Sequence, residues 1–233
     1  MLGLYISHFL QNATVAAQRQ LTKHILQWKK LTWHSLGSPP YNPIAIQRVR
    51  IDDIKRATAP SEGVDITTKD YSESYPHSGV ERGIFKYRRS GTVIQGEWDQ
   101  GGVSIERLPE VEGVRMLLED GTDIRDIPYF QRCADYIAAG HEVWGYKDIE
   151  TFYHKRPKDL RQLAESIRSQ GVVPQQELAG SAGILDEISV NIDRNGNPIF
   201  NTKGHHRLAI ARLLNIETIP VLVVVRHSGC VDV

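Results

Sequence analysis

Four adjacent residues, Gly204-His205-His206-Arg207, combine the side-chain types that hold a phosphate group. The residues that follow, 208–214, favour a helix, because alanine and leucine are frequent among them and the apolar positions cover one face. The first turn of a helix presents backbone N–H groups and about half a positive charge, so it attracts anions. Arg207 adds a planar fork of donors, and His206 can donate a hydrogen bond or transfer a proton near neutral pH.

Gly204 has no Cβ, which permits close approach of a phosphate to the backbone. We therefore predict that Gly204, His205, His206 and Arg207 bind a phosphate-bearing ligand and that His206 also takes part in catalysis. The alternative is purely structural: Gly204 ends a turn and Arg207 bridges a surface carboxylate. Consecutive helical residues point about 100° apart, so His205 and His206 are a poor chelate, and we predict no metal-binding residues.

The elements around this segment are well specified. Residues 187–192 alternate between polar and apolar, Asn195-Gly196 is a strong hairpin turn, and residues 198–200 resume a strand. After the helix, the run from Ile219 to Val225 is continuously apolar and mostly β-branched, which is typical of a strand buried on both faces. The pattern predicts a hairpin, then the helix, then a central strand.

This order of segments resembles the N-terminal domain of the ParB and sulfiredoxin superfamily. The resemblance covers about Leu160 to His227 and includes the helix and glycine turn at 163–171, Pro174, the Gly-His-His-Arg segment and the Ile219-Pro220-Val221 strand entry. It implies a nucleotide such as ATP or CTP at the helix start, with Mg²⁺ as its partner. Nucleotide hydrolysis and phosphoryl transfer are both activities of the superfamily.

Two activities of the superfamily are disfavoured. Sulfiredoxin-like members carry a catalytic cysteine where this chain has His205, and the DNA-reading domain that follows in ParB has no counterpart in the six residues after His227. Kinase-like relatives use a carboxylate as base, and the candidates here are Glu177 and Glu187. The alternative function is a non-catalytic nucleotide-sensing or nucleic-acid-associated regulatory module, since no motif fixes either carboxylate.

The rest of the chain is predicted from periodicity and turn residues. We expect N-terminal helices between Leu4 and Trp33, a turn at 37–43, a strand at 44–51 and a long loop at 57–82. A hairpin is expected between 92–94 and 103–105, and helices at 124–137 and 158–170. The predicted class is α+β, a small mixed sheet with packed helices, in three segments: 1–40 (helical), 41–130 (an α+β region with long loops) and 131–233 (the ParB/sulfiredoxin-like domain).

Composition narrows the partners. Lysine plus arginine equals aspartate plus glutamate at 28 each, so there is no global positive field, and a nucleic-acid partner is not favoured. No run of 18 or more apolar residues is present, which predicts no membrane span. Cys133 and Cys230 fit no zinc or redox spacing, so we expect reduced thiols and a cytoplasmic location. The oligomeric state stays open.

Overall fold

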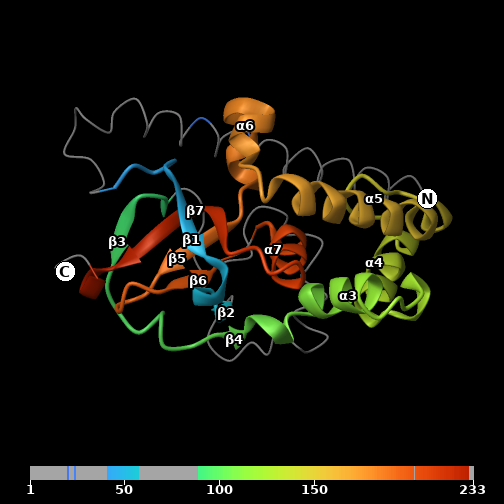
Figure 1. Cartoon of the computed structure of the whole chain (residues 1–233), viewed down its shortest axis with the longest axis horizontal. Helices are drawn as coiled ribbons and strands as arrows, with labels where there is room; N and C mark the ends of the chain where they lie inside the picture. The colour runs from blue at the N-terminus through green and yellow to red at the C-terminus, as the bar shows by residue number, and fades with distance from the viewer. Residues whose placement is uncertain (1–19, 21–23, 25–40, 58–88, 202, 231–233) are drawn as a thin grey trace.

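The computed structural model describes residues 20, 24, 41–57, 89–201 and 203–230, with side chains omitted at 180–182. The described part combines one mixed β-sheet with packed helices, which confirms the predicted α+β class (Figure 1). The predicted N-terminal helices and the predicted loop beyond residue 57 lie outside the described residues.

The sheet runs in the order β1-β7-β5-β6-β2-β4, with β3 beside β7. Its strands are β1 (Ile46–Arg50), β2 (Arg56–Ala57), β3 (Thr92–Ile94), β4 (Val103–Ser104), β5 (Ser189–Ile192), β6 (Pro198–Phe200) and β7 (Thr218–His227). β7 is an interior strand, with β1 and β3 on one side and β5 on the other, and its apolar run is buried along nearly its whole length, as the sequence predicted.

β7 is longer than any of its neighbours, so two strands share one of its edges. β1 pairs antiparallel with 218–222, while β3 pairs parallel with 225–227. On the other edge β5 runs parallel to β7, and β6 returns antiparallel to β5 through the turn that contains Gly196. The predicted hairpin at 187–200 is therefore confirmed.

The predicted hairpin between 92–94 and 103–105 is wrong. β3 pairs with β7 and β4 pairs antiparallel with β2, so the two segments join different edges of the sheet. Each run has only two or three residues, and such short strands carry little register information of their own. The pairing is decided by the free edge of β7 and by the position of β2 beside β6.

The α-helices are α3 (Pro109–Leu118), α4 (Pro128–Ala138), α5 (Ile149–Gln170), α6 (Gln175–Ala179) and α7 (His205–Leu213). Short 3-10 helices are η1 (Ile51–Asp53), η3 (Ile105–Arg107), η4 (Ile124–Asp126), η5 (Gly180–Asp186) and η6 (Ser228–Cys230). The helix predicted at 124–137 is thus a 3-10 turn followed by α4, because a proline at a helix's first position starts the regular helix at Pro128. α3 and α6 were not predicted.

α5 is much longer than the predicted 158–170. It begins after Asp148, whose carboxylate accepts the Thr151 N–H at 2.7 Å, and it passes through Pro157. A proline inside a helix removes one backbone hydrogen bond and is normally a stop signal. Here the buried side chains Phe152 and Leu160, on either side of the proline, hold the helix against the core.

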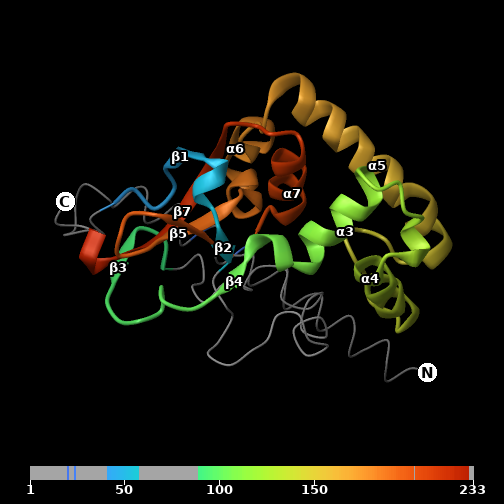
Figure 2. The same ribbon diagram turned by 60° about the horizontal axis from the view of Figure 1, so that its bottom comes forward.

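Two apolar layers cover the sheet. Ile219 and Val221 of β7 face the main core, which also takes side chains from α3, α4, α5 and α7. Leu222 and Val224 point the other way, into a smaller cluster with Leu185. α7 lies between the sheet and the group formed by α3 and α5 and contacts both of these helices (Figures 1 and 2).

α3 and α4 approach closely at Gly113. A Cβ at this position would lie 2.8 Å from Cδ1 of Tyr129, closer than real contacts allow. We expect Gly113→Ala to destabilise the fold by about 1 kcal/mol in urea unfolding, since overpacking outweighs the gain in helix propensity. In a Tyr129→Ala background the same change should stabilise the protein. Stabilisation in the wild-type background would contradict the close approach.

Candidate functional site

The start of α7 is fixed to the beginning of β5. The backbone N–H of Lys203 donates to the Ser189 hydroxyl at 3.0 Å, and the Ser189 N–H donates to the Lys203 carbonyl at 3.2 Å. Gly204 then adopts a left-handed conformation, with φ +83°, and the first bond of the helix runs from the Leu208 N–H to its carbonyl at 2.9 Å. The positive end of the helix dipole is therefore at 205–207.

Gly204 has a sufficient structural reason to be glycine. A Cβ there would lie 2.5 Å from Cγ1 and 2.8 Å from Cα of Ile188, which is itself fully buried. The positive φ is a second reason, since residues with a Cβ rarely adopt it. The glycine is needed to join β6 to α7 whether or not a phosphate approaches, so its presence does not by itself argue for a ligand.

His206 is the centre of a cluster built from three helices and a loop. Its Nε2 lies 3.2 Å from the Tyr129 hydroxyl of α4, and Nη2 of Arg156 in α5 lies 3.0 Å from its Nδ1 and 3.3 Å from its Nε2. The indole of Trp144 meets the imidazole edge-on, with 4.8 Å between ring centroids. His205 lies beside it, with 4.4 Å between the two imidazoles.

The donor and acceptor roles of the two His206 ring nitrogens depend on the tautomer of the imidazole. Arginine only donates, so a hydrogen bond from Arg156 to His206 needs a ring nitrogen without a proton, and Nδ1 is the nearer of the two. With Nδ1 accepting, the proton sits on Nε2 and can be donated to the Tyr129 oxygen. Arg156 thus adds a positive charge beside the positive end of the α7 helix dipole.

Arg156 also contacts the residues around the turn at 143–146. Its guanidinium lies over the Trp144 ring, 4.3 Å from the centroid, and close to the Tyr146 hydroxyl. That hydroxyl donates to Asp159, and burial, reinforced by this carboxylate, raises the pKa of Tyr146 to about 12, although Arg156 acts in the opposite direction. Among the described residues, no carboxylate forms a direct ion pair with Arg156.

Arg207 points into the protein. Its guanidinium donates to the Asp186 carbonyl, and its Nη1 lies 3.9 Å from Oε2 of Glu187, with the side chain 12% exposed. These contacts anchor the start of α7 to the segment that leads into β5. A direct role for Arg207 in phosphate binding stays a prediction. In this arrangement its side chain holds the start of α7 against residues 186–187.

The two predicted carboxylates lie differently. Glu187 is fully buried, and its Oε1 accepts the Gln176 N–H at 2.8 Å, so it fixes the start of α6. Burial, partly offset by these backbone N–H groups and by Arg207, raises the pKa of Glu187. Glu177 is exposed in the first turn of α6. No described hydrogen bond or ion pair joins either carboxylate to His206.

Neither Tyr129 nor Arg156 is among the residues that the sequence predicts for the site. Arg156 precedes a proline, which normally ends a helix, so no local pattern placed it on α5. Tyr129 and Arg156 are 77 and 50 residues from His206 in the chain. Only the packing of α4 and α5 against α7 brings them together.

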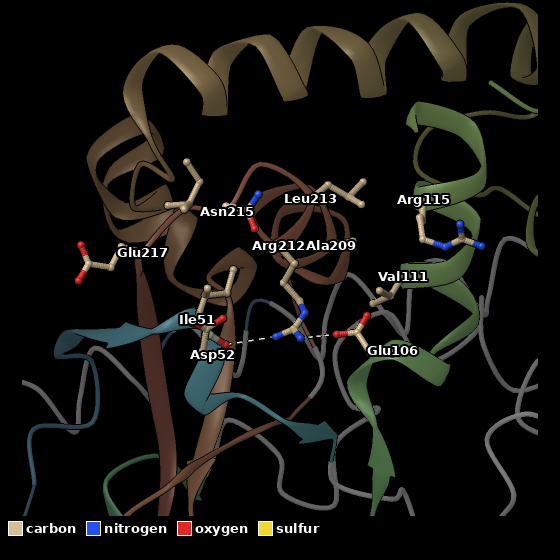
Figure 3. Close-up of a pocket in the computed structure, with 11 residues that line it drawn as sticks. Ile51, Asp52, Glu106, Val111, Arg115, Ala209, Arg212, Leu213, Asn215 and Glu217 are labelled. Atoms are coloured by element: carbon tan, nitrogen blue, oxygen red, sulfur yellow. Dashed lines mark hydrogen bonds and ion pairs between the residues drawn. The ribbon is translucent and has the colours of Figure 1, made fainter. Parts of the chain in front are cut away.

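Residues 204–207 line neither of the two described cavities. One, of about 350 Å³, lies at the other end of α7 and is lined by Ile51, Glu106, Arg115 and Arg212 among others (Figure 3). Arg212 there donates to the Ile51 carbonyl and pairs with Glu106, so its charge is used to join η1 to η3. The second, of about 500 Å³, is lined by Tyr129 as well as by residues of α3 and η3.

Comparison of the chain with protein-family models, with curated proteins and with solved structures finds no match. Over the described residues, no helix is long and apolar enough to cross a bilayer. In the same part of the chain, no group of three or more His, Cys, Asp or Glu side chains is arranged to hold a metal ion. The function must therefore be argued from the geometry around His206.

Proposed function

We propose that the N-terminal end of α7 binds the phosphate of a nucleotide, with His206 and Arg156 as its principal side-chain contacts. The observation that carries this proposal is the approach of Arg156 to His206, at 3.0 Å, beside the positive end of a helix. The Arg156 guanidinium and the positive end of α7 converge there beside the His206 imidazole, and a phosphate accepts hydrogen bonds from the guanidinium and from the N–H groups of the helix start. The cytoplasmic location expected from the reduced cysteines is part of the same proposal.

The contacts of Arg156 define an order of events at this site. While Arg156 donates to Nδ1, the lone pair of His206 is occupied and the imidazole cannot take a proton there. An anion would draw the guanidinium to itself, because a charge-assisted hydrogen bond is about twice as strong as a neutral one. His206 would then be able to accept a proton from an attacking hydroxyl or water, which is the general-base step of phosphoryl transfer or nucleotide hydrolysis.

A second candidate function is a nucleotide sensor that performs no chemistry. The observation in its favour is the commitment of Glu187 to the Gln176 N–H, with Glu177 exposed and not in described contact with His206. Phosphoryl transfer usually needs Mg²⁺ held partly by carboxylates, so the assignment of Glu177 and Glu187 as catalytic residues stays a prediction. Turnover measurements distinguish the two candidates, whereas binding measurements do not.

Binding is tested by thermal unfolding with ATP, CTP, GTP and ADP, each with and without Mg²⁺. A ligand at 100 times its Kd stabilises the native state by about 2.7 kcal/mol, which for a chain of this size raises Tm by roughly 5–10 °C. We expect Arg156→Ala to weaken binding about 10- to 100-fold, the loss expected for a hydrogen bond to a charged group.

The matched control is Arg161→Ala, which removes the same charge from an exposed position on the same helix. It should leave the affinity within about twofold of wild type, because exposed charges act weakly at physiological salt. If no nucleotide raises Tm of the wild type, the proposed function is wrong. If Arg156→Ala and Arg161→Ala bind alike, the ligand lies elsewhere.

A further inference from the structure

Trp144 is held in an unusual backbone conformation beside the site. It lies in a tight turn closed by two hydrogen bonds between Val143 and Tyr146, of 3.0 and 2.9 Å, and its own φ is +50°. Positive φ is unfavourable for a bulky side chain, and such strain concentrates at functional sites. Gly145, the next residue, can adopt its φ of +88° without strain. A glycine at position 144 would have removed the strain, so the indole itself needs an explanation.

The turn presents the indole at the surface instead of burying it. Trp144 is 37% exposed, whereas Val143, the residue before it, is 4% exposed and packs in the main core. Among the described residues, only Trp144 and Leu178 are exposed large hydrophobic side chains. The turn is therefore anchored through Val143, and core anchoring alone does not account for the position of the tryptophan.

The indole of Trp144 contacts both side chains that are proposed to hold phosphate. Its edge meets His206, and Arg156 lies over its ring at 4.3 Å, so one guanidinium contacts both the imidazole and the indole. Tyr129 and Phe152 lie around it at 6.1 and 6.4 Å between centroids, in tilted orientations that fix the plane of the ring. The indole of Trp144 thus forms a fixed, partly exposed aromatic surface next to Arg156 and His206.

We infer that Trp144 is a stacking surface for an aromatic ring carried by the phosphate ligand, which makes the ligand a nucleoside phosphate and not a simple sugar phosphate. This inference rests on the proposed phosphate site at α7. Every nucleobase has a π-face, so stacking on an indole favours bases in general and selects weakly among them. The arrangement places the phosphate at His206 and Arg156 and the base beyond them on Trp144.

The test compares AMP with ribose 5-phosphate, which has the same phosphate and ribose but no base. Calorimetry on the wild type should give a Kd for AMP about 5- to 100-fold lower than for ribose 5-phosphate, the range expected for one base on one aromatic side chain. Trp144→Ala should remove most of this difference and leave the Kd of ribose 5-phosphate within about threefold of wild type. Trp144→Phe should keep much of the difference.

The outcomes separate the inference from the proposed function. Equal affinities of the wild type for AMP and ribose 5-phosphate would overturn the stacking role and leave the phosphate site standing. Equal weakening of both ligands by Trp144→Ala would also overturn it, because the tryptophan would then only position Arg156. Absence of binding by either ligand would overturn both proposals. Similar affinities for AMP, CMP and GMP would support stacking over base-specific recognition.

Discussion

Gly204→Ala is expected to lower the free energy of unfolding by about 2–5 kcal/mol. A left-handed conformation costs a residue with a Cβ about 1–2 kcal/mol, and forcing a methyl group into a packed core costs about 1–3 kcal/mol more. The position has both problems, since φ is +83° and the new Cβ would lie 2.5 Å from Ile188 Cγ1. Urea unfolding followed by circular dichroism measures the change as a shift in midpoint at constant slope.

Gly196 supplies a matched control, because its φ is also +83° but nothing lies within 4 Å of the Cβ position. Gly196→Ala should therefore cost only the conformational part, about 1–2 kcal/mol. The difference between the two variants measures the contact with Ile188. Equal losses would show that Ile188 moves away at no cost and that the close approach at Gly204 does not constrain the sequence.

This comparison bears on how the Gly-His-His-Arg segment is interpreted. From the sequence, Gly204 is predicted to let a phosphate approach the backbone and Arg207 to hold it. In the structure the glycine is required by Ile188, and Arg207 is turned toward Asp186 and Glu187. The packing of the fold therefore explains the presence of Gly204 and Arg207 without a ligand. The support for a ligand comes from His206 and from Arg156, a residue that the sequence does not single out.

The elements that were predicted correctly are those whose signals are local. The Asn195-Gly196 turn fixes the hairpin, and the β-branched run of β7 needs burial on both faces, which only a central strand provides. The errors have tertiary causes. β3 takes its partner from the free edge of β7, and α5 continues through Pro157 because Phe152 and Leu160 are buried on either side of it.

The loop between β3 and β4, which the sequence predicts to be a hairpin turn, is instead fixed by contacts of Asp99 with other parts of the sheet. Its Asp99 is 1% exposed and receives three hydrogen bonds from Arg194: from the backbone N–H at 3.0 Å, from Nε at 2.8 Å and from Nη2 at 2.7 Å. His227, at the end of β7, lies 3.9 Å from the same carboxylate and 2.8 Å from the Gly96 carbonyl. The β5–β6 turn and the end of β7 therefore hold this loop.

Asp99 is accordingly expected to link stability to pH. Burial alone would raise the pKa of Asp99, but the hydrogen bonds from Arg194, helped by His227, outweigh it and lower the pKa from 3.8 to about 2. A lowering of this size corresponds to about 2 kcal/mol of stability at neutral pH. Because the folded pKa is the lower one, this contribution is complete above about pH 4 and is lost as pH falls toward 2.

Asp99→Asn should therefore destabilise the protein by about 2–4 kcal/mol at pH 7, since it removes one partner of a buried pair and leaves Arg194 without its main acceptor. The difference between wild type and variant should shrink as urea unfolding is repeated from pH 5 down to pH 2.5. Asp120→Asn is the control: its pair with Arg115 is 41–46% exposed, so it should cost less than about 1 kcal/mol and show little dependence on pH. A constant loss in Asp99→Asn across this range would mean that the carboxylate acts through shape and not through its charge.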